Sequence, residues 1–106
     1  MKKVITSTGN SLQSLFDLRF GRAGWFCVYD EETKTTTFIE NELKDAQGGA
    51  GTKASEKMIE LGVQMVVSGD FGPKAKDLLD KFKIQMVIMP DDGSTIENII
   101  KKFQGN

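Results

Sequence analysis

The spacing of hydrophobic residues changes near residue 52, from a repeat of two to a repeat close to 3.6. Before that point, short apolar runs rich in β-branched and aromatic residues predict strands. After it, apolar residues three and four positions apart predict helices that alternate with short apolar strands. The predicted strands cover residues 2–7, 25–29, 35–39, 65–67 and 86–89, and the last of these, a continuous apolar run, is expected to be buried. Helices are predicted to begin near residues 52, 73 and 94.

Local signals place the helix ends and the core. Gly62 suits the position after a helix, Pro73 suits a first turn, and Ser94 with Glu97 forms a capping box. The loop 11–21 is expected to be anchored by buried apolar side chains. The predicted core-facing residues of the loop and the three helices are Leu12, Leu15, Phe16, Phe20, Ala54, Met58, Leu61, Ala75, Leu78, Leu79, Phe82, Ile96, Ile99, Ile100 and Phe103.

The order of elements is therefore βββαβαβα, which predicts an α/β fold. Two strand–helix–strand crossovers imply parallel strands with right-handed connections, and the opening hairpins make the second strand antiparallel to the others. The expected result is a ribonuclease H-like, five-stranded mixed sheet flanked by helices. The length of 106 residues fits a single domain over 1–106.

This topology gathers the loops at one edge of the sheet. The loops 7–10, 41–51, 68–72 and 90–93 all follow the carboxyl ends of parallel strands, and the segment 19–22 precedes the antiparallel strand at the same edge. Ligands of open α/β sheets favour this edge. We therefore expect the functional site there.

Composition excludes several classes of protein. The net charge is −1, so no global attraction draws the chain to nucleic acid or an anionic membrane, and no apolar run approaches a membrane span. The single cysteine allows no internal disulfide, which favours a cytoplasmic location. The absence of histidine removes most general bases and most metal sites. A ribonuclease H-like nuclease would need a carboxylate on the strand 2–7, which has none. The chain is therefore not expected to be an enzyme.

The glycine-rich run 48–53 precedes a predicted helix, where backbone N–H groups suit an anion. It lacks the order of a Walker loop. Gly49, Gly51 and Ala54 match part of a dinucleotide fingerprint, with Asp70 downstream, but the preceding strand belongs to a hairpin and the loop is too long. The alternative is a connector whose glycines only cap a helix.

Two further segments are expected beside it. The turn 68–73 contains two glycines at another helix start, and it is either a tight structural turn or a second part of the site. Arg19 and Arg22 suit a partner with several acceptor atoms, although Asp17 offers either of them a local partner. We expect Arg19 to be structural and Arg22 to face a ligand, while Cys27 is expected to be an inert core thiol.

Taken together, the segments 19–23, 48–51 and 68–73 resemble the dinitrogenase iron–molybdenum cofactor-binding family of NifX/NifB-C-terminal-like domains, which includes the molybdenum–copper orange protein. The resemblance covers essentially the whole chain. It implies a ribonuclease H-like fold and non-catalytic binding or carriage of a molybdenum-containing iron–sulfur or copper–sulfide cluster, with cluster donor or acceptor proteins as partners. Many relatives carry histidine or cysteine near the glycine loop, so the lack of histidine here favours non-covalent capture, and no metal ligand is assigned.

The sequence thus leaves a leading hypothesis and two alternatives. The first is a carrier of an anionic metal–sulfur cluster. The second is a protein–protein adaptor or regulator that uses the same edge without a cofactor. The third is a phosphate-ligand enzyme, against which the sequence speaks because it offers neither a base nor a nucleophile. The predicted cluster-binding residues are Arg19, Arg22, Gly48, Gly49, Gly51, Thr52, Gly69, Asp70 and Gly72.

Overall fold

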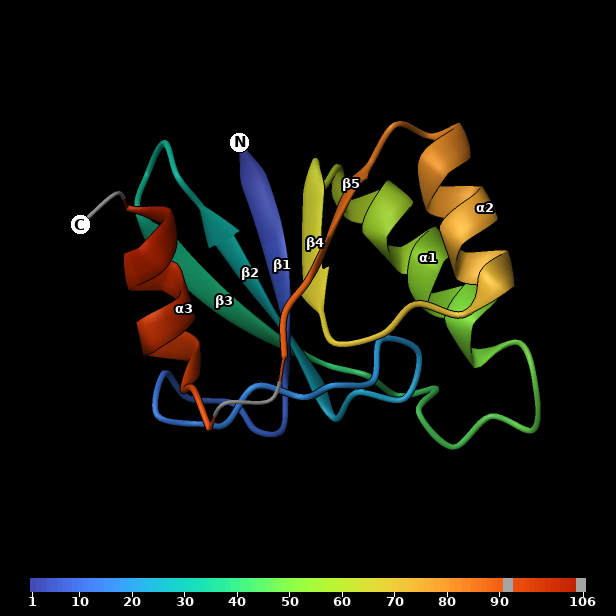
Figure 1. Cartoon of the computed structure of the whole chain (residues 1–106), viewed down its shortest axis with the longest axis horizontal. Helices are drawn as coiled ribbons and strands as arrows, with labels where there is room; N and C mark the ends of the chain where they lie inside the picture. Colours follow the sequence, from blue (N-terminus) through green and yellow to red (C-terminus); the bar gives the residue numbers. More distant parts are fainter. Residues whose placement is uncertain (91–92, 105–106) are drawn as a thin grey trace.

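A computed structural model of the chain, which describes residues 1–90 and 93–104, contains one five-stranded sheet with the order β3-β2-β1-β4-β5 (Figure 1). The element order is βββαβαβα, as predicted. The elements are β1 (Lys2–Ser7), β2 (Trp25–Asp30), β3 (Thr35–Glu40), α1 (Ala50–Leu61), β4 (Met65–Ser68), α2 (Pro73–Lys81), β5 (Gln85–Ile88) and α3 (Ile96–Phe103).

Strand β1 is the centre of the sheet. It pairs antiparallel with β2 on one side and parallel with β4 on the other, while β3 pairs antiparallel with β2 and β5 pairs parallel with β4. Only β2 runs against the remaining strands. This mixed sheet confirms the predicted α/β fold and is consistent with a ribonuclease H-like topology.

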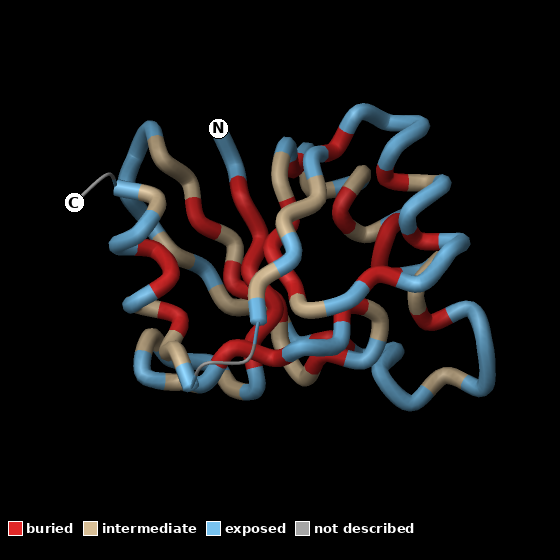
Figure 2. Tube along the Cα trace, in the orientation of Figure 1, coloured by how far each residue is buried: buried red, intermediate tan, exposed pale blue. Residues whose placement is uncertain are grey.

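The helices cover the two faces of the sheet unequally. Helices α1 and α2 lie side by side on one face and α3 covers part of the other (Figure 1). Alternate residues of β1 therefore enter different cores: Val4 packs with the α1–α2 layer and Ile5 with α3. Buried segments follow the sheet and the inner sides of the helices (Figure 2). No helix in the described part of the chain is long and apolar enough to cross a membrane.

Three side chains predicted to be in the core are exposed. Leu15 is 52% exposed because the neighbouring Phe16 is buried and the segment is extended there, bridging to Thr95. Phe82 is 51% exposed because it lies at the C-cap of α2, past the last turn. Ile88 is 60% exposed because β5 is an edge strand, not the buried strand that its apolar run predicts.

Two helix starts also differ from prediction. Helix α1 begins at Ala50, which places Gly51 and Thr52 inside its first turn, while its end at Gly62 (φ 71°) is as predicted. Helix α3 is capped by Thr95, whose side chain accepts a hydrogen bond from the Asn98 N–H, and not by Ser94. Residues 91 and 92 of the predicted loop 90–93 lie outside the described residues.

Candidate anion-binding site

Loops 8–24, 41–49 and 69–72 lie at the edge of the sheet where β1, β4 and β5 end, at the bottom of Figure 1. Buried polar contacts fasten the first of these loops to the strands. The Thr6 hydroxyl donates to the Asp17 carbonyl and lies 2.9 Å from the Ser68 hydroxyl, and the Asp17 N–H donates to the Thr6 carbonyl at 2.9 Å. These contacts fix the start of the arginine segment over the ends of β1 and β4.

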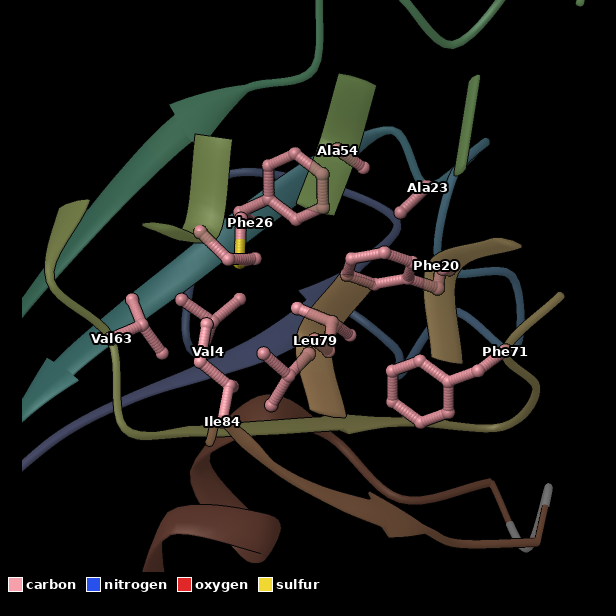
Figure 3. Packing of buried hydrophobic residues seen from close by; sticks show 12 residues of the cluster. Val4, Phe20, Ala23, Phe26, Ala54, Val63, Phe71, Leu79 and Ile84 are labelled. Carbon is pink, nitrogen blue, oxygen red and sulfur yellow. The ribbon is translucent and has the colours of Figure 1, made fainter. Parts of the chain in front are cut away.

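Two aromatic side chains anchor the loops that carry the candidate site. Phe20 stands between the arginines, and Phe71 stands between Asp70 and Gly72. Both are 3% exposed, and their ring centroids lie 5.1 Å apart in the core between the sheet and helices α1 and α2 (Figure 3). Burying this pair holds side by side two loops whose phenylalanines are 51 positions apart in sequence. Truncating either ring would cost about 3–5 kcal/mol.

Asp17 is the hub of the arginine segment. Its carboxylate, 4% exposed, accepts from the Arg19 Nε and Nη2 at 3.1 Å each, from the Arg19 N–H at 3.0 Å and from the Gly24 N–H at 3.3 Å. The hydrogen bonds and charge of Asp17 raise the pKa of Arg19 above its ordinary value. Arg19 therefore neutralises a buried carboxylate and keeps its own positive charge.

Arg22 clamps the glycine-rich loop. Its Nη1 donates to the Lys44 carbonyl at 2.7 Å and its Nη2 to the Ala46 carbonyl at 3.0 Å. Buried Asn41 adds to this link, because its Nδ2 donates to the Gly21 and Ala23 carbonyls at 3.0 and 2.9 Å. The guanidinium is exposed, but it has a structural role that the sequence did not predict.

Helices α1 and α2 both begin at this edge without a side-chain cap. Their N-cap residues are Gly49 and Gly72, neither of which has a side chain to offer, whereas α3 on the other face is capped by Thr95. The two uncapped helices pack against each other. Their first-turn N–H groups and dipoles make the electrostatic environment favourable for negative charge.

A cavity of about 280 Å³ lies where these features meet. Such a volume is below the ~300–1,000 Å³ usual for organic ligands, which favours a small ligand. Two cations and one carboxylate line it, together with backbone from both helix starts. The lining residues are Arg19, Phe20, Gly21, Arg22, Ala50, Gly51, Asp70 and Gly72.

The structure thus brings five of the nine predicted residues around one cavity and leaves four outside its lining. Gly48 and Gly49 are exposed at φ 128° and 71°, and Thr52 lies in the first turn of α1. Gly69 is packed beneath Leu18, so close that a Cβ there would lie 2.5 Å from the Leu18 Cδ2. The glycine at 69 is therefore explained by packing.

Sequence reasoning did not single out Gly21 by itself. A Cβ at Gly21 would lie 2.7 Å from the Gly51 nitrogen, so only glycine lets the arginine segment approach the start of α1 this closely. A second cavity of about 390 Å³ shares Arg19 and Arg22 with the first and was also missed. The sequence feature that could have indicated this second cavity is the pair of adjacent charged residues Lys44 and Asp45, both of which line it.

The residues present do not suit direct metal ligation. Cys27 is fully buried in β2, and burial raises the pKa of its thiol to about 12, so it supplies no thiolate. Within the described residues, no group of three or more Cys, His, Asp or Glu side chains is placed to hold a metal ion. In place of ligands, the cavity offers hydrogen-bond donors from the two arginines and from the backbone at the starts of α1 and α2.

Comparison with known proteins identifies the family. The model of the family described as dinitrogenase iron-molybdenum cofactor matches residues 1–106. The chain belongs to this family. No curated protein matches the chain.

Two solved structures are similar to this chain in sequence and in fold. The apo form of the orange protein from Desulfovibrio gigas is 28% identical with a TM-score of 0.90, over 98% of this chain and 87% of that chain. A putative NifB protein from Thermotoga, assigned to the DUF35 family, is 28% identical with a TM-score of 0.83, over 99% and 88% of the two chains. Both structures therefore share the fold described above over nearly the whole of this chain.

Proposed function

We propose that this chain is a non-catalytic carrier that binds an anionic, molybdenum-containing metal–sulfur cluster non-covalently in the cavity between Arg19, Arg22 and the starts of α1 and α2. The cargo is an iron–sulfur or copper–sulfide cluster containing molybdenum, received from or passed to partner proteins. The observation that carries this proposal is the meeting of two uncapped helix N-termini with two arginines around one small cavity. Family membership supplies the class of cargo.

The chemistry of the cavity fits a sulfide-rich polyanion held without covalent bonds. Arginine is weakly hydrated and presents several hydrogen-bond donors. Backbone N–H groups at a helix start can donate hydrogen bonds to an anion without the help of a side chain. Asp70 is the one lining carboxylate and limits how much negative charge the cavity tolerates. The absence of histidine from the sequence and the burial of Cys27 leave capture by donors as the supported mode.

Reconstitution tests the proposal directly. The purified protein is incubated with tetrathiomolybdate, with and without copper, then desalted, and its visible absorption and metal content are measured. Stoichiometric retention of molybdenum is expected, and it should fall as salt is added because screening weakens the charge contribution. Retention of no molybdenum under either condition would contradict the carrier function and favour an adaptor that uses this edge without a cofactor.

A further inference from the structure

A groove of about 490 Å³ runs between the end of β3 and α1, apart from the candidate anion site. Apolar side chains form part of its lining. Phe26 and Ala54 are almost fully buried beneath it, Ile39 is half-buried, and Leu43 is 45% exposed. A large apolar side chain from outside would therefore find its apolar contacts mainly at Ile39 and Leu43, on the β3 side of the groove.

The rim of the groove is acidic and its charges are unpaired. Four glutamates line it with only two lysines: Glu40, Glu42, Glu56 and Glu60 with Lys53 and Lys57. None of these six side chains takes part in an ion pair within the described residues. On α1 the two glutamates are four residues apart, a spacing at which like charges repel. Lys53 and Lys57 lie three residues before Glu56 and Glu60 and offset part of this repulsion, although neither pair is in ion-pair contact. An external cation would relieve this repulsion between the carboxylates.

We propose that this groove docks a basic segment of a partner protein, with one large apolar side chain inserted between lysines or arginines. The apolar lining selects the inserted side chain, and the excess of carboxylates selects the flanking charges. The docking does not depend on the proposed cargo, because the groove shares no lining residue with the cavity at Arg19 and Arg22.

The groove is nevertheless connected to that cavity through one loop. Leu43 lines the groove, and the next residue, Lys44, offers its carbonyl to Arg22. Asn41 also lines the groove, and its side chain holds the carbonyls of Gly21 and Ala23. A partner seated on Leu43 would therefore contact the loop that Arg22 clamps.

The test uses amide chemical shifts of the full chain and a synthetic peptide with one phenylalanine flanked by lysines. Shifts are expected at 39–43 and along the groove side of α1. Peptides with glutamate for lysine, or serine for phenylalanine, should bind at least about tenfold more weakly. The variant Glu56→Lys/Glu60→Lys should weaken the lysine peptide by a similar factor, and Leu43→Ser should weaken it without changing the net charge.

The matched control is Asp77→Lys/Asp80→Lys, two exposed acids of α2 outside the groove whose reversal changes the net charge equally. Docking predicts less than about a twofold effect for this control. Equal weakening by both double variants, or shifts elsewhere on the molecule, would overturn the proposal as unspecific attraction. If the same amides shift with protein concentration alone, a second copy occupies the groove and the partner-segment proposal is wrong.

Discussion

At the residue scale, a variant of Cys27 tests whether its thiol belongs to the core or is a metal ligand. It is fully buried in β2 and packs with the α3 side of the sheet. We expect Cys27→Ala to bind tetrathiomolybdate as the parent does, while the free energy of unfolding falls by about 1 kcal/mol from lost packing. Titration of the folded variant measures the first, and chemical denaturation the second. Loss of binding by a folded Cys27→Ala protein would show that the thiol contacts the cargo.

The same thiol gives a pH dependence with a defined sign. Its pKa is raised from 9.0 to about 12 by burial, so the unfolded chain loses this proton more readily than the folded one. The stability that the neutral thiol contributes is present below pH 9 and is lost as the pH rises toward 12, at up to about 1.4 kcal/mol per pH unit. The difference in unfolding free energy between the parent and Cys27→Ala should therefore shift in favour of the variant over this interval. A constant difference between pH 8 and pH 11 would contradict the buried, neutral state.

The two arginines should respond differently to truncation. Arg19→Ala leaves the buried Asp17 carboxylate with only backbone donors, and we expect a loss of about 1–2 kcal/mol of unfolding free energy. Arg22→Ala removes exposed contacts to two loop carbonyls, so the loss should stay below about 1 kcal/mol while cluster retention falls. Thermal melting and reconstitution of both variants measure this contrast. The reverse pattern would exchange the roles of the two side chains.

At the element scale, the uncapped start of α2 offers a substitution with opposite effects on stability and binding. Gly72 has φ −66° and ψ 163°, an extended conformation that suits an N-cap aspartate, and a Cβ there meets no atom within 4 Å. Gly72→Asp should stabilise the fold by a few tenths of a kcal/mol. Its carboxylate should also occupy the N–H groups that an anion would use and weaken tetrathiomolybdate binding roughly fivefold, equivalent to about 1 kcal/mol.

Gly72→Ala is the matched control for that variant. Alanine adds a Cβ at the same position but neither a charge nor a capping oxygen. It should therefore leave anion binding within about twofold of the parent. Titration of both variants under the same salt conditions gives the comparison. Equal binding by Gly72→Asp and Gly72→Ala would place the anion away from the start of α2.

Element order and type were predictable because the hydrophobic periods differ clearly between strands and helices. The ends of the helices were less predictable. Ser94 and Thr95 are both good cap residues, and only the packed position of α3 selects Thr95. The apolar run of β5 resembles a buried strand, and nothing local tells that it lies at the sheet edge with Ile88 exposed. Phe82 is helix-spaced with Leu78 and Leu79, yet α2 ends before it.

At the scale of the whole molecule, the candidate site is a product of topology more than of any one motif. Strands β1, β3 and β4 run in the same direction and lead into the loops 8–24, 41–49 and 69–72 at one edge, which the element order already implied. The sequence could not predict that Arg22 reaches the carbonyls of Lys44 and Ala46, or that Gly69 lies under Leu18, because both are contacts between distant segments. The sequence therefore predicted the edge of the sheet at which these loops meet, but not which residues contact one another there.

The most direct test of the central claim is an amide shift titration of the isotopically labelled chain with tetrathiomolybdate. We expect the shifts to concentrate at residues 50–52, at 72, 74 and 75, and at 21–22, where the helix starts and the arginines meet. The turn 31–34 and Gly62, at the opposite edge of the sheet, should not shift. Saturable shifts at the first set alone would support an anion site built from backbone and arginine. Shifts that cluster at the opposite edge or along α3, with none at the starts of α1 and α2, would contradict it.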